Sequence, residues 1–221
     1  MGALRQVADD VWTGRTVPGP WLNVVVLGDV VVDSGLRWSR RRLAEVLRGR
    51  DVSAHVVTHA HADHTGSSAW LCRHTGAGLQ MGAADAVRFE SGRIDTVASA
   101  LGRAVARLAE PERAPVDRHL REGDAVGSFV VVEAPGHSPG TIALWRAADR
   151  VLVVGDSPVN VSRSASAPRW VHLPRSLHCD ADQVRVSRRR LAELRPALVV
   201  PVHGHPVADA DAWAAAMTTG G

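Results

Sequence analysis

The sequence contains no lysine, no tyrosine and only two cysteines among its 221 residues. Cys72 and Cys179 cannot form a disulfide framework, so we expect two reduced thiols. The apolar stretch 22–27 contains the polar Asn23 and is far too short to span a bilayer, and no charged-then-apolar leader opens the chain. We therefore expect a cytoplasmic protein with no membrane partner.

Positive charge in this chain comes from arginine alone. All 26 basic residues are arginines, and the formal net charge is only +3. The densest basic runs, 40–42 and 188–190, lie in stretches with leucine and alanine at helical spacing, which is typical of solvated helix faces. No basic patch is interleaved with aromatic residues, so no nucleic-acid partner is expected.

Length and patterning favour one α/β domain. The composition, 45% hydrophobic and 22% charged, supplies enough apolar material for a sizeable core. β-Branched runs occur in both halves of the chain, and each half closes with a helix followed by a strand. We expect a single domain over residues 1–221, with two packed sheets and helices outside them. Residues 83–114, rich in alanine and arginine, are expected to form a helical insertion.

The pattern also places individual elements. We expect one strand at 7–13, a hairpin of strands at 22–27 and 30–33, and one helix at 64–74 that ends near Gly76. Asp180 is the expected N-cap of a helix that runs to residue 194. The stretch 157–179 is rich in serine, proline and arginine, so we expect a loop there.

Histidine is abundant, with 11 copies, and its placement indicates chemistry. His59, His61, Asp63 and His64 follow a predicted strand at 54–58 in the spacing H-x-H-x-D-H. Residues two apart at a strand end project to the same side, so His59 and His61 can share one metal ion. Asp63 and His64 come as the chain turns into a helix, so they can aim at a second point close by.

Three further candidate ligands lie at turns or strand ends. His137 lies in the turn 134–141, Asp156 follows a strand at 151–154, and His203 follows the last strand at 197–202. Glycine and proline around each residue allow its side chain to reach a cleft. Imidazole and carboxylate are ligands that divalent zinc, iron and manganese accept, and no cysteine lies inside these motifs.

With Asp33 in Val31-Val32-Asp33-Ser34-Gly35, these motifs give the sequence five landmarks in order. In them the sequence resembles the metallo-β-lactamase-fold superfamily over nearly its whole length, in particular its single-domain branch of glyoxalase II-like and general hydrolases. The resemblance implies an αββα four-layer sandwich that holds two divalent metal ions, with zinc expected first and iron or manganese as alternatives. It implies a first metal on His59, His61 and His137, a second on Asp63, His64 and His203, a bridge by Asp156, and an orienting role for Asp33. Val202 departs from the family pattern, because many members have glycine there.

The function implied by this resemblance is a dinuclear metal-dependent hydrolase. A metal-bridged hydroxide would cleave a small ester, thioester or lactone, and Asp63 would orient the nucleophile and carry a proton to the leaving group. The alternative is a mononuclear iron persulfide dioxygenase of the same fold, although the presence of all candidate ligands favours two metals. A phosphodiesterase or nuclease is less favoured, and so is a β-lactamase, because that branch generally lacks the bridging aspartate. A binding module with a decayed site is disfavoured because no ligand position is lost.

Residues at the mouth of the expected cleft are weaker candidates. Trp21 and Trp170 are candidates to line a substrate pocket, and ordinary packing is the alternative for both. Three arginines of the 157–179 stretch, Arg163, Arg169 and Arg175, would suit an anionic substrate unless they are simply solvated. His172 and His178 lie where substrate would enter, and the partner is expected to be a small molecule. The sequence leaves the oligomeric state open, with a homodimer as one option.

Overall fold

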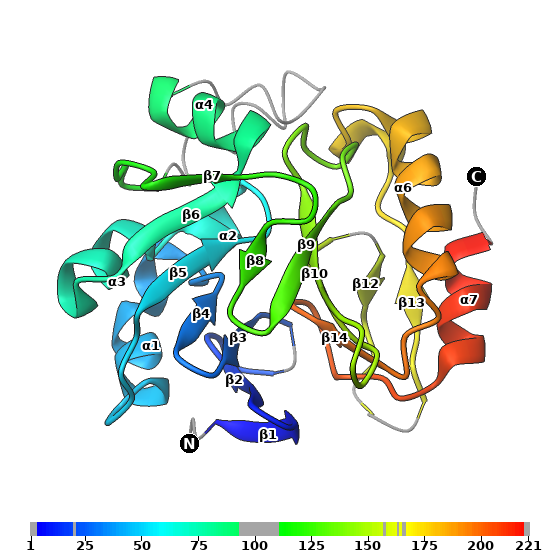
Figure 1. Ribbon diagram of the computed structural model, residues 1–221, viewed down its shortest axis with the longest axis horizontal. Helices are drawn as coiled ribbons and strands as arrows, with labels where there is room; N and C mark the ends of the chain where they lie inside the picture. Colours follow the sequence, from blue (N-terminus) through cyan, green and yellow to red (C-terminus); the bar gives the residue numbers. More distant parts are fainter. Residues whose placement is uncertain are drawn as a thin grey trace.

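The molecule has four layers, in which two β-sheets pack face to face and helices cover both outer faces (Figure 1). The computed structural model describes residues 4–19, 21–92, 111–156, 158–162, 164 and 167–218. The expected α/β class and four-layer sandwich are confirmed. No helix in these ranges combines the length and the apolar character that a bilayer crossing requires.

The first sheet has seven strands that follow one another in chain order. Strands β1 to β4 pair antiparallel, whereas β4 to β7 run parallel, so helices occupy the crossover connections. The strands are β1 (Arg5–Ala8), β2 (Val11–Arg15), β3 (Asn23–Leu27), β4 (Val30–Val32), β5 (Ala54–Val57), β6 (Gly78–Gly82) and β7 (Arg118–Leu120).

The second sheet has five strands in the order β14-β11-β10-β9-β8. Its β11 and β14 are parallel, and the other neighbours are antiparallel. The strands are β8 (Ala125–Val126), β9 (Phe129–Glu133), β10 (Ile142–Arg146), β11 (Val151–Val154) and β14 (Leu198–Pro201). A separate two-stranded ribbon consists of β12 (Val159–Asn160) and β13 (Trp170–Val171).

Helices lie on the two outer faces and at the sheet edges, with α1 and α3 on one side and α6 and α7 on the other (Figure 1). The α-helices are α1 (Arg40–Val46), α2 (Ala62–Thr65), α3 (Ser68–Thr75), α4 (Ala83–Ser91), α6 (Ala181–Glu193) and α7 (Ala210–Thr218). Two short 3-10 helices are η1 (Arg37–Ser39) and η2 (Arg175–Leu177). As expected, Asp180 caps α6, because its side chain accepts hydrogen bonds from two backbone N–H groups.

The alternation of side chains along β3 divides this strand between two cores. Val25 faces the second sheet and joins Phe129 in the central core. Val24 faces the opposite way and packs with Leu43 of α1 and Leu71 of α3. Because both faces of the strand are buried, its apolar run is unbroken in the sequence.

The outer face of the second sheet carries a third core. Leu152 of β11 packs there with Leu191 of α6 and with Trp213 and Met217 of α7. Trp213 is fully buried and is one of the largest side chains in the interior. The alanine-rich tail of the chain therefore forms a structural helix that covers the sheet.

Three element predictions are wrong in detail. The strand expected at 7–13 is a hairpin of β1 and β2, which turns at residues 9–10 with Asp10 at φ 50°. The helix expected at 64–74 is broken between α2 and α3, where a Cβ on Gly66 would lie 2.5 Å from the backbone N of Arg37. This close approach requires glycine and turns the chain. The expected loop at 157–179 contains β12, β13 and η2.

The helical insertion expected at 83–114 is described only in part. It begins as α4, which ends at Ser91 and is capped by Gly92 in the left-handed conformation with φ 70°. Residues 93–110 lie outside the described residues. Residues 111–114 are described and are not helical, so the predicted helical end at 114 is wrong.

Candidate metal centre

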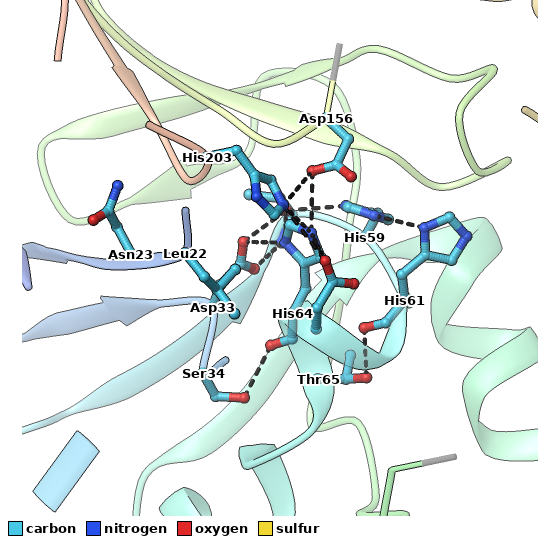
Figure 2. A network of polar contacts seen from close by, with 12 residues as sticks. Leu22, Asn23, Asp33, Ser34, His59, His61, His64, Thr65, Asp156 and His203 are labelled. Atoms are coloured by element: carbon cyan, nitrogen blue, oxygen red, sulfur yellow. Dashed lines mark hydrogen bonds and ion pairs between the residues drawn. The ribbon is translucent and has the colours of Figure 1, made fainter. Parts of the chain in front are cut away.

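The predicted ligands come from segments that follow the carboxyl ends of strands in both sheets. Asp33 follows β4, His59 follows β5, Asp156 follows β11 and His203 follows β14, while His137 lies in the turn between β9 and β10. Both β4–β5 and β11–β14 are parallel pairs, so each pair presents its carboxyl ends at one edge. The two edges meet, and the side chains converge there (Figure 2).

The first group of candidate ligands consists of His59, His61 and His137. One donor atom from each residue lies within 4.8 Å of the others. His59 Nε2 is 2.9 Å from His61 Nδ1, and the ring centroids of His61 and His137 are 4.5 Å apart with the rings at 89°. His59 and His137 are buried, and His61 is partly buried.

The second group consists of Asp63, His64, Asp156 and His203. Asp156 Oδ1 lies 3.1 Å from His64 Nε2 and 3.1 Å from His203 Nε2. Asp63 Oδ2 lies 3.5 Å from His203 Nε2 and 3.6 Å from His64 Nε2. All seven predicted ligands therefore lie at one place, in two adjacent groups.

Asp156 faces both groups. While Oδ1 faces the second group, its Oδ2 lies 3.5 Å from His137 Nε2 in the first group. The side chain is almost completely buried, at 7% exposure for the residue. This position between the groups matches the bridging role that the resemblance implies.

The donor set fits metal ions. Two nitrogens of the first group, His61 Nε2 and His137 Nε2, are buried without a hydrogen-bond partner. Buried polar atoms are normally paired, so these two nitrogens favour a ligand at this point. Neutral imidazole nitrogens and carboxylate oxygens are the donors that divalent zinc, iron and manganese accept.

In the first group all three histidine pKa values are lowered, which favours the neutral imidazoles that bind metal ions. Burial lowers the pKa of His59 well below its usual value, and neighbouring His64 and His61 lower it further. Burial likewise lowers the pKa of His61, and it lowers that of His137 to about 3. These imidazoles are therefore neutral at physiological pH, with lone pairs available to a cation.

In the second group the histidine pKa values are raised instead of lowered. Burial alone would lower the pKa of His203, but the Asp156 and Asp63 carboxylates outweigh it and raise the pKa to about 10. Burial is also outweighed at His64, where Asp63, Asp156 and Asp33 hold the pKa well above its usual value. The surplus of carboxylate charge that stabilises these imidazolium ions would equally stabilise a metal cation that replaces their protons.

Asp33 orients His64. Its Oδ2 lies 2.7 Å from His64 Nδ1, and its two oxygens accept hydrogen bonds from the backbone N–H and the hydroxyl of Thr58 at 2.7 and 2.8 Å. Asp33 is fully buried and has φ 59°, in the left-handed region. With Nδ1 directed at Asp33, His64 presents Nε2 to the second group.

Two asparagines hold the backbone of residues 203–205 in place through hydrogen bonds. Asn23 donates to the Gly204 carbonyl at 2.6 Å, and Asn160 donates to the His205 carbonyl at 3.0 Å. His203 Nδ1 lies 2.5 Å from the Trp21 carbonyl oxygen, which directs Nε2 toward the carboxylates. The sequence prediction missed both asparagines, because isolated amides at strand ends carry no recognisable spacing.

Asp85 of α4 is another residue that the sequence prediction missed. It is fully buried, and its Oδ2 accepts hydrogen bonds from Ala60 N–H at 2.8 Å and from the Ser138 hydroxyl at 2.5 Å. Its Oδ1 accepts from Gly140 N–H at 2.7 Å. The carboxylate therefore joins the segment of His59 and His61 to the turn that carries His137. An aspartate in the first turn of a helix is ordinarily solvent-exposed, so no sequence signal marks it.

The residues that the sequence suggested as substrate contacts lie in different surroundings in the structure. His178 is buried, with Nδ1 3.0 Å from His137 Nδ1, so it contacts a candidate ligand. The ring centroids of Trp170 and Trp213 are 5.3 Å apart in an edge-to-face arrangement. Trp170 therefore packs against the core of the second sheet, as expected if it does not line a substrate pocket. Trp21 stays 43% exposed beside His203. Arg163 lies outside the described residues.

Comparison with known proteins agrees with the geometry. The family described as the metallo-beta-lactamase superfamily matches residues 23–204, a range that includes every predicted ligand. A Bacillus subtilis (strain 168) protein named "Probable metallo-hydrolase YflN" is 24% identical over 204 residues, covering 80% of this chain and 76% of that protein.

Two solved structures have a similar fold. A beta-lactamase domain protein from Burkholderia ambifaria superposes with a TM-score of 0.71 at 26% identity, covering 97% of this chain and 74% of that one. The structure of TTHA1623 in a di-iron-bound form gives a TM-score of 0.63 at 26% identity, covering 88% of this chain and 93% of that one.

Proposed function

The chain belongs to the metallo-beta-lactamase superfamily, and on this premise we propose that it is a dinuclear metal-dependent hydrolase of a small ester, thioester or lactone. The observation that carries the proposal is the position of Asp156, which directs one carboxylate oxygen at each group of candidate ligands. A carboxylate between two sets of neutral or anionic donors is suited to hold two cations close together.

In this proposal each group holds one metal ion. His59, His61 and His137 would hold the first, Asp63, His64 and His203 would hold the second, and Asp156 would contribute to both. Zinc is the first expectation, because the donors are nitrogen and oxygen in a compact set. Iron is the main alternative, and the similar structure titled as di-iron-bound supports keeping it. When bound, such cations would lower the pKa of a coordinated water molecule and polarise the bond under attack.

The residues of the chain supply the proton transfer. Asp63 has its pKa held at about 2, because His64 and His203 outweigh the effect of its burial, so it is ionised at neutral pH. Its side chain is 36% exposed, whereas that of His64 is fully buried. Asp63 is therefore the carboxylate of the second group that can reach a bound substrate. In hydrolysis the water oxygen bonds to the carbonyl carbon and the carbon–oxygen or carbon–sulfur bond breaks. The Asp63 oxygen that does not face His64 and His203, Oδ1, passes the water proton to the leaving atom.

A panel of small esters, thioesters and lactones tests this function. We expect the zinc-loaded protein to hydrolyse at least one class, and we expect Asp156→Asn and Asp63→Asn to lose at least about 100-fold in kcat/KM. His74→Ala is the matched control, since this histidine stacks on Trp70 away from both groups of ligands. No hydrolysis of any class, together with oxygen uptake on a persulfide by the iron-loaded protein, would instead support the dioxygenase.

A further inference from the structure

A cavity of about 300 Å³ lies between α6 and the segment that precedes it. His178 lines this cavity and also contacts the candidate ligand His137, through the 3.0 Å approach of their Nδ1 atoms. The cavity is therefore one side chain away from the candidate metal centre. Its volume is at the lower limit for small-molecule sites, so it suits a charged fragment rather than a large cofactor.

The lining of the cavity is strongly basic. Three arginines, Arg175, Arg185 and Arg188, contribute to it together with His172 and His178. No carboxylate is among its lining residues in the part of the chain that the structure describes. Asp182, which does not line the cavity, pairs with Arg175 at 3.3 Å and also with Arg185.

Helix α6 separates its charges by face. Val184, Arg185 and Arg188 line the cavity at helical spacing. Arg190, on another face, forms an ion pair with Glu122 at 2.6 Å. The arginines that line the cavity and the arginine paired with Glu122 therefore lie on different faces of α6.

Arg188 is the innermost of these cations. The residue is only 4% exposed, and burial lowers the pKa of its guanidinium to about 10, so it remains charged at neutral pH. Its positive charge reaches His178, because it helps to lower the pKa of that imidazole. A fixed guanidinium with a planar set of donors matches a carboxylate or a phosphate.

We propose that this cavity binds an anionic group, a carboxylate or a phosphate. The anion is either a substituent of the substrate or a separate small anion. The first reading rests on the proposed hydrolase function, and the second does not. In both readings Arg188 is the central cation, and Arg175 and Arg185 approach from the solvent side.

Calorimetric titration of inorganic phosphate into the zinc-loaded protein tests the cavity itself. Phosphate that binds to the metal ions contributes equally in every variant, so differences between variants report the cavity. We expect the phosphate Kd to rise at least about tenfold in Arg188→Gln and about threefold or more in Arg175→Gln and Arg185→Gln. Arg189→Gln removes the same charge from an exposed position of α6 outside the lining, and its Kd should match the wild type.

Equal phosphate affinity in all four variants would overturn the proposal. If Arg188→Gln does not fold, Arg175→Gln and Arg185→Gln decide the result, because both residues are exposed. This titration needs no catalytic activity, so its outcome is independent of the hydrolase assignment.

A matched pair of substrates distinguishes the two sources of the anion. The pair is a thioester with an uncharged acyl chain and its analogue with a terminal carboxylate. If the substrate carries the anion, Arg188→Gln raises KM for the charged thioester about tenfold and leaves the uncharged one unchanged. If the anion is separate, phosphate alters hydrolysis of the uncharged thioester more in the wild type than in Arg188→Gln, where only the effect of phosphate on the metal ions remains. No effect of the variant on either reaction, with unchanged phosphate binding, contradicts both readings.

Discussion

Replacement of Asp85 tests whether one buried carboxylate holds the two ligand-bearing segments together. Asp85 accepts two backbone N–H donors, from Ala60 and Gly140, and the hydroxyl of Ser138. In Asp85→Ala the Ser138 hydroxyl keeps a neighbour, Thr141 Oγ1 at 2.8 Å, but both backbone donors lose their acceptor. Each unsatisfied buried donor costs about 1–3 kcal/mol, so the free energy of unfolding should fall by about 2–6 kcal/mol.

The loss should be partial in Asp85→Asn. The amide retains the shape of the side chain and one oxygen acceptor. Its NH₂ group replaces the other oxygen, so the donors that bonded to that oxygen lose their acceptor. We expect a decrease of about 1–3 kcal/mol in this variant. Because the two segments carry His59, His61 and His137, zinc affinity should fall in the same order, with the alanine variant weaker than the asparagine variant.

Urea unfolding and competition for zinc with a chelator measure the two effects. Asp211→Ala is the matched control, because Asp211 also lies in the first turn of a helix but is exposed. Replacement of Asp211 removes the same favourable interaction of a carboxylate with the helix dipole, but it leaves no buried N–H donor without an acceptor. An Asp85→Ala protein that unfolds within about 0.5 kcal/mol of Asp211→Ala and binds zinc as tightly would refute this reasoning.

Three other changes have defined outcomes. Asp33→Asn weakens the acceptor that orients His64, so zinc affinity should fall about 10–100-fold in chelator competition, and unchanged affinity would exclude this role. Gly66→Ala places a Cβ 2.5 Å from Arg37 N and 2.5 Å from Ala62 O, so urea unfolding should show a loss of about 2 kcal/mol or more. Gly49→Ala, where a Cβ meets nothing within 4 Å, should lose only the cost of a left-handed alanine at φ 74°, about 1 kcal/mol. In the metal-free protein, folded-state pKa values below 6.5 at His59, His61 and His137 mean that the unfolded chain binds more protons below that pH. Near pH 6.5 the raised pKa values of His64 and His203 oppose this effect, but below about pH 5.5 both imidazoles are protonated in the folded and in the unfolded chain. The free energy of unfolding should therefore fall by up to about 4 kcal/mol per pH unit between about pH 5.5 and 5, and a flat profile there would contradict these shifts.

Short-range spacing explains why part of the site could be predicted from the sequence. His59 and His61 stand two residues apart after β5, and Asp63 and His64 occupy the turn of α2 that follows, so local geometry alone brings them together. His137, Asp156 and His203 were predicted from their motifs and their order in the family, and the structure brings them to the same edge.

Long-range contacts explain what could not be predicted. Asp85 acts on residues 25 to 55 positions away, and His178 contacts His137 across 41 positions. No local pattern encodes such pairs. The break between α2 and α3 has the same origin, because Gly66 is required by the backbone of Arg37 rather than by its own neighbours in sequence.

Metal content is the most direct test of a centre with two metal ions bridged by Asp156. Elemental mass spectrometry on protein purified without added metal should find about two equivalents of zinc, iron or manganese per chain in the wild type and in His74→Ala. His59→Ala and Asp156→Ala should each lower this value, because one removes a ligand of the first group and the other removes the bridge. One equivalent of iron, unchanged in Asp63→Ala and His203→Ala, would contradict the dinuclear centre.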